Sequence, residues 1–340
     1  MPAISSNLQK RIRFRFSLRS FLIALTAICI LGGWKLERVR RQRAAVEWLR
    51  YEGGDVEYDY GDKSDLRFSD DAPPGSWTTI YRWLGVDFFY EVKRAKLFQN
   101  YAVDLKPMSA LTTIRELELD NTPINDISAL SQLTRIESLK LEGTAVTDLA
   151  PLRKMNALTK LVVASTAVRD ISPLEYLPNL AKLNLDKTLA TDLSPLSQSY
   201  SLEELSIKHT TVSDLQPLSR LRKLREISLC GTQVTDLTAL AQITAIQSVD
   251  LESCPVSSLK GLENLADLTL VNASFTHVAD LTPLSKATKL KSLSLRNAPV
   301  ADLSPLSSLR SLVILDLRGT AVSDLSPLVD LPEVMIVLGK

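Results

Sequence analysis

Aliphatic residues recur along most of this chain with a fixed period of 22 residues. Each unit is numbered here from an aspartate at position 0, and aliphatic side chains follow at +1, +4, +7, +10, +13, +15 and +20. The unit that begins at Asp214 carries them as Leu215, Leu218, Leu221, Leu224, Ile227, Leu229 and Val234. A constant period of roughly 20 to 30 residues with this leucine spacing predicts a solenoid of stacked units.

Two patterns within a unit predict its local structure. The Leu-x-Leu pair at +13 and +15, such as Leu183 and Leu185, has the period of 2 that is typical of a strand with one buried face. The segment D-L-S-P-L-S-x-L spaces its apolar residues by three and four, which predicts one turn of 3₁₀ or α-helix. One unit is therefore expected to contain a short strand, a turn and a helical return.

The aspartates at position 0 are expected to be structural caps. Each precedes the helical turn, whose first N–H groups lack partners, and the proline nearby, such as Pro151, needs no N–H there. A calcium-binding ridge is the alternative, but a calcium site needs several oxygen ligands around one ion and each unit offers one aspartate. We therefore expect no metal. The caps are Asp104, Asp126, Asp148, Asp170, Asp192, Asp214, Asp236, Asp280, Asp302 and Asp324, and Ser258 takes the remaining position.

The order L-x-x-L-x-x-L-x-L-x-x-T-x-V-x-D-L-x-P-L resembles the leucine-rich repeat family, in the short variety of internalin-like and phosphatase-regulator-like proteins. The resemblance covers about Val92 to Leu338. It implies an α/β solenoid, a horseshoe with parallel concave strands and short helical turns on the convex side. The family usually has Asn at +18, where this chain has Thr122, Thr144, Thr166, Thr188, Thr210, Thr232, Thr276 and Thr320, with Cys254 and Ala298 as exceptions. We expect a weaker inner side-chain ladder, because a hydroxyl offers the backbone less than an amide.

An apolar run near the N-terminus, Ser20 to Trp34, lies between two groups of five basic residues. It predicts an uncleaved signal anchor that crosses a membrane once, which makes the chain similar to a bacterial membrane-anchored member of the family. A cleaved signal peptide is the alternative, but a small-x-small cleavage site is missing. The basic residues do not decide the orientation, and the resemblance favours repeats on the extracytoplasmic side.

The remaining boundaries follow from composition. We expect a basic tail over residues 1–19, the anchor over 20–34, a juxtamembrane helix and aromatic N-terminal cap over 35–91, and the repeats over 92–340. The helix continues from Trp34 to Arg50 and stops at Gly53 and Gly54; the segment "DVEYDY" alternates like a strand, and "SWTTIYRWLG" is typical of a short helix. The aromatic residues of the cap are Trp77, Tyr81, Trp83, Phe88 and Phe89.

Catalytic motifs are scarce, and we expect a protein that is not an enzyme and needs no cofactor. The two histidines, His209 and His277, lie about three units apart, too far for one metal. The three cysteines, Cys29, Cys230 and Cys254, suggest no disulfide framework. The net charge of +1 argues against a nucleic-acid-binding protein.

Binding of a protein on the concave face is the expected function. Positions +12, +14 and +16 flank the buried strand residues and should form three outward columns. These positions are acidic in early units, and in late units they are mixed basic with exposed apolar groups, which suits a protein partner. The candidate residues are Glu118, Lys140, Glu142, Lys160, Lys182, Glu204, Lys208, Asp250, Arg296, Ile314 and Arg318, with Phe275 beside the columns.

Three alternatives stay open. In the first, the protein is structural or self-associating and its concave face is an ordinary solvated surface. In the second, the chain regulates an enzyme in trans from the cytoplasmic side. The third concerns the apolar segment Val334 to Leu338, which is expected to present an open strand edge. That edge predicts weak end-to-end dimerisation or capture of a partner strand, and a frayed end is its alternative.

Overall fold

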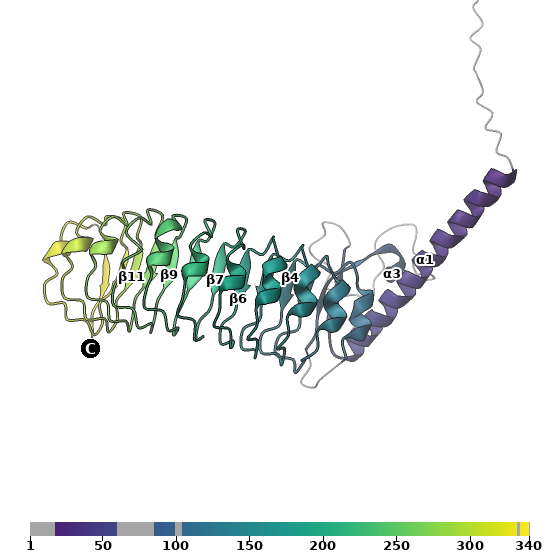
Figure 1. Ribbon diagram of the computed structural model, residues 1–340, viewed down its shortest axis with the longest axis horizontal. Coiled ribbons are helices and arrows are strands. Elements are labelled where there is room, and N and C mark those ends of the chain that lie inside the picture. The colour runs from purple at the N-terminus through teal and green to yellow at the C-terminus, as the bar shows by residue number, and fades with distance from the viewer. Residues whose placement is uncertain (1–17, 60–84, 99–103, 332–333, 340) are drawn as a thin grey trace, which may run out of the picture. The chain divides into compact units, whose positions relative to one another are not determined.

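The computed structural model describes residues 18–59, 85–98, 104–331 and 334–339 (Figure 1). It divides into two compact units. The N-terminal unit contains Met1–Arg43 and Asp71–Phe89, and the solenoid unit contains Ala44–Asp70 and Tyr90–Lys340. The predicted helix in "SWTTIYRWLG" and the aromatic residues Trp77, Tyr81 and Trp83 lie outside the described residues.

The N-terminal unit is built on helix α1 (Leu18–Tyr51), which starts there and ends in the solenoid unit, and on the short helix α3 (Val86–Phe89). The carboxylate of Asp87 in α3 is buried, accepts a hydrogen bond of 3.1 Å from the amide of Gln42, and lies 3.6 Å from the guanidinium of Arg43. The ammonium of Lys35 lies 4.4 Å from the centre of the Phe88 ring. A buried carboxylate needs such partners, so Asp87 fixes α3 to α1.

In the solenoid unit, α1 ends at Tyr51 and the chain turns at Gly53, whose φ of 71° is the left-handed conformation that glycine adopts readily. Strand β1 (Asp55–Tyr58) follows and pairs antiparallel with β2 (Val92–Lys96). The predicted helix end and the predicted strand in "DVEYDY" are both present. From β2 onward every neighbouring pair of strands is parallel.

All described strands form one sheet whose spatial order is the order of the sequence. Register advances by one repeat per strand, so Leu117 pairs with Leu139 and Leu139 with Leu161. The repeat strands are β3 (Glu116–Glu118), β4 (Ser138–Lys140), β5 (Lys160–Val162), β6 (Lys182–Asn184), β7 (Glu204–Ser206), β8 (Glu226–Ser228), β9 (Ser248–Asp250), β10 (Leu270–Asn272), β11 (Ser292–Ser294), β12 (Ile314–Asp316) and β13 (Met335–Val337).

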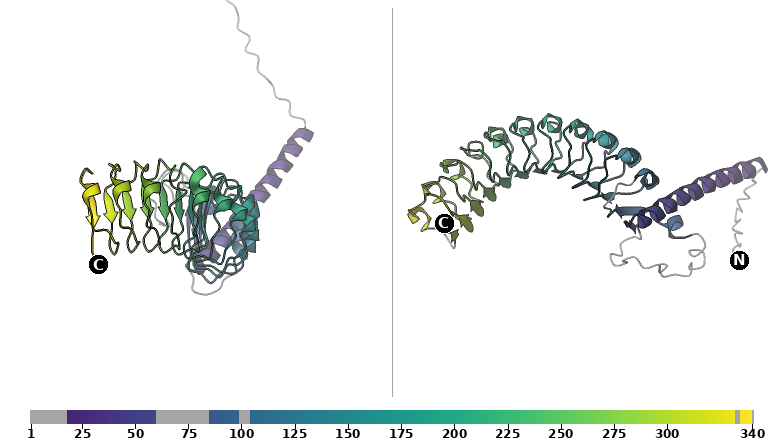
Figure 2. Two further views of the ribbon diagram at one scale, coloured as in Figure 1. Left: turned by 60° about the vertical axis from the view of Figure 1, so that its left-hand side comes forward. Right: turned by 90° about the horizontal axis from the view of Figure 1, so that it is seen from below.

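The helical returns are 3₁₀ turns, and Figure 2 shows them on the outer side of the arc with the strands on the inner side. This arrangement confirms the predicted horseshoe. The turns are η1 (Lys106–Ala110), η2 (Ser128–Gln132), η3 (Ala150–Lys154), η4 (Ser172–Tyr176), η5 (Ser194–Leu196), η6 (Gln216–Leu218), η7 (Thr238–Gln242), η8 (Thr282–Leu284), η9 (Ser304–Leu306) and η10 (Ser326–Leu328).

The unit that begins at Ser258 departs from this plan. Within the described repeats it has no 3₁₀ turn between η7 and η8, and Gly261 stands where most units have proline. Gly261 has a φ of 111°, and a β-carbon there would lie 2.3 Å from the carbonyl oxygen of Leu237. Only glycine therefore fits this close approach of one unit to the next.

The predicted aliphatic positions form the core of the solenoid. In the unit of Asp214 all seven, from Leu215 to Val234, are buried. Each fully buried leucine contributes about 1.5 to 3 kcal/mol relative to an exposed one, and neighbouring units supply the surface that covers it.

The threonines at +18 do not form a ladder between units. The hydroxyl of Thr188 donates to the carbonyl of Leu185 in its own unit at 2.7 Å, and most of the other threonines repeat this bond. Adjacent units are instead joined by backbone hydrogen bonds such as that from the N–H of Leu185 to the carbonyl of Ser206, at 2.8 Å. Thr232 differs, because its hydroxyl lies 3.4 Å from the sulfur of Cys254.

The aspartates at position 0 accept a hydrogen bond from the backbone two residues later. Asp148 accepts from the N–H of Ala150 at 2.8 Å. The residue at the N-cap of η3 is Leu149, so the aspartate acts one residue before the position that the sequence predicts. The same bond at Ser172 holds the pKa of Asp170 below its usual range, because a hydrogen bond donated to the carboxylate favours its charged form.

A second backbone feature recurs at +17, where the chain adopts a left-handed conformation. Three units have glycine there, at Gly143, Gly231 and Gly319, and seven have a side chain. Those seven are Asn121, Ser165, Lys187, His209, Ser253, Phe275 and Asn297. Asparagine tolerates this conformation, but for a bulky residue such as Phe275, with a φ of 57°, it is unfavourable.

Asp148→Ala should lower the free energy of unfolding by about 0.5 to 2 kcal/mol, because the N–H of Ala150 loses its acceptor. Chemical denaturation with and without calcium measures this, and Asp148→Asn, which keeps an acceptor oxygen, serves as the control. A calcium-dependent rise in melting temperature that Asp148→Ala abolishes would contradict a purely structural role.

Phe275→Asn should leave the protein as stable or stabilise it by up to about 1 kcal/mol, because relief of the left-handed strain outweighs the lost contact of an exposed ring. Thermal melting followed by circular dichroism measures this. Leu270→Asn is the control. Leu270 lies in strand β10, where asparagine is disfavoured, so this variant should be less stable than the wild type. A large loss of stability in Phe275→Asn would show that the ring supports the fold.

Candidate functional site on the concave face

The concave face is made by the residues that flank the buried centre of each strand. In β7, Leu205 at +13 is buried, whereas Glu204 and Ser206 on either side of it are half-buried. Because the strands are parallel and in register, equivalent residues of successive units form columns. A side chain in one column therefore lies next to its equivalent in the following unit.

The charges of the early units neutralise one another. The carboxylate of Glu118 lies 2.8 Å from the ammonium of Lys140 and 3.0 Å from that of Lys96. The hydrogen bond from Lys140, and to a smaller extent that from Lys96, holds the pKa of Glu118 below its usual range. Arg94 bridges Glu116 at 2.7 Å and Glu57 at 2.9 Å.

The middle units show the same pairing. Lys182 forms an ion pair with Glu204, and the ammonium of Lys208 lies 3.3 Å from the carboxylate of Asp250. Asp250 also accepts from the amide of Asn272 at 3.0 Å. Cys230 lies on this part of the face, and burial with the nearby carboxylates raises its pKa to about 11, so its thiol is protonated at neutral pH.

Two predicted residues stand outside these pairs. Glu142 is exposed, and its backbone N–H donates to the carboxylate of Asp120 at 2.9 Å. Lys160 is half-buried in β5 and, among the described residues, forms no ion pair. Neither contributes to a cluster with the other predicted residues.

The late units carry a different surface, which we call the late concave cluster: Leu270, Phe275, Arg296 and Ile314. Phe275 is 42%, Leu270 39% and Ile314 42% exposed. Leu270 and Ile314 both pair with Ser292, so a small side chain separates two apolar ones. The guanidinium of Arg296 lies 5.3 Å from the centre of the Phe275 ring.

Arg296 and Arg318 differ in their partners. Arg318 is held by Asp316 through a hydrogen bond of 2.9 Å, and this pairing lowers the pKa of Asp316. In the described part of the chain, no carboxylate forms an ion pair with Arg296. The sequence pattern placed both arginines at +16 but could not distinguish them, because Asp316 was not among the predicted residues.

The left-handed backbone at Phe275 was also not predicted from the sequence. The signal was present, since glycine or asparagine stands immediately before the +18 position in five units. The exposed ring thus lies on a strained backbone beside an arginine without a carboxylate partner. This combination is suited to contact with another molecule.

The described residues contain no group of three or more His, Cys, Asp or Glu side chains that could hold a metal ion. The cysteines are free: Cys254 is buried and donates to the carbonyl of Leu229 at 3.0 Å, while Cys29 is exposed on α1.

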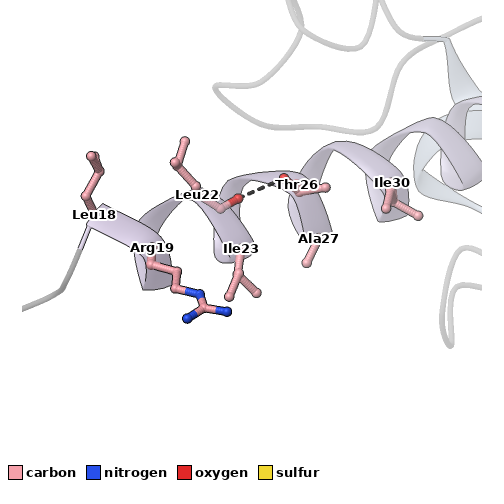
Figure 3. A pocket seen from close by; sticks show the side chains of 7 residues that line it. All are labelled: Leu18, Arg19, Leu22, Ile23, Thr26, Ala27 and Ile30. Carbon is pink, nitrogen blue, oxygen red and sulfur yellow. Dashed lines mark hydrogen bonds between the residues drawn. The ribbon is translucent and has the colours of Figure 1, made fainter.

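A shallow hollow lies along the exposed apolar surface of α1. Figure 3 shows its lining side chains, among them Leu22, Thr26 and Ile30, and the hydroxyl of Thr26 donates to the carbonyl of Leu22 at 2.8 Å. The hydroxyl is therefore satisfied within the helix, as an apolar surrounding requires. By length and composition α1 is long and apolar enough to cross a membrane, although a signal sequence has the same properties.

Comparison with known proteins gives a consistent result for the fold. No protein-family model and no curated protein matches the chain in sequence. An internalin of Listeria monocytogenes superposes with a TM-score of 0.59 at 22% identity, over 71% of this chain and 86% of that one. A leucine-rich repeat protein of Leptospira interrogans superposes with a TM-score of 0.65 at 20% identity, over 68% of this chain and 62% of that one.

A eukaryotic receptor has the same architecture. The leucine-rich repeat ectodomain of the plant membrane receptor kinase GASSHO1/SCHENGEN3 from Arabidopsis thaliana, in complex with Casparian strip integrity factor 2, superposes with a TM-score of 0.59 at 16% identity. The match covers 71% of this chain and 35% of that one. Together with the parallel sheet and its 3₁₀ returns, these matches show that the solenoid has the leucine-rich repeat fold.

Proposed function

We propose that this chain is a membrane-tethered module that binds a protein through the concave face of its solenoid. The observation that carries the proposal is the late concave cluster, where the exposed ring of Phe275 lies against Arg296 on a left-handed backbone. Strained backbone often occurs at functional sites. An aromatic residue and an arginine are also the side chains that most often supply the binding energy of a protein interface.

The distribution of charge supports the late units as the contact region. Lys140, Lys182 and Lys208 are each engaged by a carboxylate of the same face. A partner would have to break those pairs to use them, at a cost in desolvation. Arg296 needs no such exchange, and the exposed side chains of Leu270 and Ile314 in the same late units provide apolar area.

The partner that best fits this cluster is a protein segment with an apolar side chain and a carboxylate. The apolar side chain would lie between Leu270 and Ile314, over Ser292. The carboxylate would meet the guanidinium of Arg296, whose planar donors match it in geometry. The similar plant ectodomain, which forms a complex with Casparian strip integrity factor 2, is consistent with such a use of the fold.

Tethering is proposed from helix α1. Its apolar side chains, including Phe21, Ile28 and Trp34, are exposed in the described structure, and burial in lipid would remove them from water. The anchor is assigned to residues 20–34, with the repeats on the extracytoplasmic side. A cleaved signal sequence is the outcome that an experiment must distinguish from the anchor.

The anchor predicts that the full-length chain stays in the membrane fraction after a carbonate wash, because its backbone bonds are satisfied within the helix while its apolar side chains contact lipid. Protease added outside intact cells should then digest the repeats. A soluble mature chain that begins after Trp34 would contradict anchoring, and repeats that resist protease until the cells are lysed would contradict the orientation.

The late concave cluster predicts that Phe275→Asn and Arg296→Glu each weaken binding of a partner identified by crosslinking in native membranes, by at least about 1 kcal/mol. A direct affinity measurement with the purified partner gives the effect.

A matched control is available on the convex side, where the guanidinium of Arg153 lies 5.5 Å from the centre of the exposed Tyr176 ring. Tyr176→Asn and Arg153→Glu make the same chemical changes and should leave affinity unchanged. Equal effects at both pairs, or no effect at either, would refute the late concave cluster as the binding site.

A further inference from the structure

A second surface, separate from the late concave cluster, is formed by the segment R-L-R-K-L-R, residues 220–225. It connects the turn η6 to the strand β8. Leu221 and Leu224 are fully buried, whereas all four cations are exposed. We call Arg220, Arg222, Lys223 and Arg225 the basic ribbon.

The backbone under the basic ribbon is held by hydrogen bonds. The N–H of Leu221 donates to Leu218, that of Leu224 to Leu221, and that of Arg225 to the carbonyl of Glu203 in the preceding unit, at 2.8 to 2.9 Å. With both leucines in the core, the four cations are displayed from a fixed support. Binding to such a preorganised segment loses less conformational entropy than binding to a mobile one.

The surroundings of the basic ribbon distinguish it from other exposed cations. At the same +9 position, Lys289 pairs with Asp267 of the preceding unit at 2.6 Å, and at +11 Arg115 pairs with Glu137 of the following unit. The +9 neighbours of Lys223 are the uncharged Ser201 and Ala245, whereas the +11 neighbours of Arg225 are Glu203 and Gln247. Within the described residues, none of the four cations of the ribbon forms an ion pair.

Four like charges over six residues repel one another, and no ion pair in the described chain relieves them. An anion bound there would gain from all four at once, since the field of a charge cluster is additive. Arginine is the side chain whose planar donors match carboxylate, sulfate and phosphate groups. The segment spans at most roughly 17 Å along the chain, which suits a linear anion rather than a single small one.

We infer that the basic ribbon binds a linear acidic polysaccharide. The uncharged side chains next to it favour a sugar chain over other polyanions. Gln198 and Gln242 have exposed amides in the two adjoining units, and the ring of Tyr200, whose hydroxyl donates to the amide oxygen of Gln198 at 2.5 Å, is 49% exposed. Amides and hydroxyls can donate to and accept from sugar hydroxyls. Single-stranded nucleic acid would need successive aromatic platforms for its bases, and Tyr200 is the only aromatic residue of the described chain in these units.

This inference is independent of the proposed function. The basic ribbon lies between the 3₁₀ turn and the strand of its unit, whereas the late concave cluster is carried by β10, β12 and the turn residues that follow β10 and β11. The loss of one site therefore leaves the other intact, and the two can be tested separately.

The test uses the full-length protein in neutral detergent and heparin as the probe, with binding followed by surface plasmon resonance at several salt concentrations. The variant R220Q/R222Q/K223Q/R225Q removes the ribbon. The control R135Q/R169Q/K286Q/R310Q removes three arginines and one lysine, all exposed, from four other units. Both variants change the net charge equally, and both should melt as the wild type does because the substituted side chains are exposed.

We expect the wild type to bind heparin with an affinity that falls as salt rises, the ribbon variant to bind at least about tenfold more weakly, and the control to bind within about twofold of the wild type. Unsulfated dextran should not bind. If both variants bind heparin equally weakly, the loss of affinity comes from the change in net charge alone, and the inference is overturned. Tighter binding of a single-stranded oligonucleotide or of anionic vesicles than of heparin would overturn the assignment to a polysaccharide.

Discussion

Stacking of one repeat on the next is the interaction on which the rest of this structure depends. A single unit of 22 residues has aliphatic side chains at seven positions but only a three-residue strand and one short turn, so it cannot cover them alone. Burial is completed by the neighbouring units, which is the general condition of a solenoid. The cost of ordering each unit is met only in the array, and units without a neighbour would not persist as folded structure.

The constant period has a direct effect on the surface. Because no residue is inserted between Asp104 and Asp324, every outward position stands beside its own equivalent in the next unit. Opposite charges at related positions then meet, as Glu118 and Lys140 do, and like charges would repel along the whole column. Several concave charges are consequently paired within the protein.

The two proposed binding sites lie where the array departs from its own pattern. The unit of Ser258 lacks the 3₁₀ turn, has Gly261 in contact with the preceding unit, exposes Leu270 on its strand and has the bulky Phe275 at the +17 position, where the backbone is left-handed in the neighbouring units as well. The unit of Asp214 concentrates four unpaired cations on one connecting segment. The scaffold supplies rigidity to both, and the departures supply the chemistry, since function in a common fold lies in the sites placed upon it.

The sequence by itself determined the architecture of this protein. The positions of Leu215, Leu218 and their equivalents were sufficient to predict strand, turn and core, because burial depends on a period that is visible in the letters. Tertiary structure alone decided the partners of the surface residues. Arg318 is held by Asp316 of its own unit, whereas Arg296 lies over the ring of Phe275 in the preceding unit. The left-handed backbone of Phe275 is imposed by the turn that each unit must make. The direction in which each of these side chains turns is not encoded in the repeat period, so only the folded arrangement decides which contacts form.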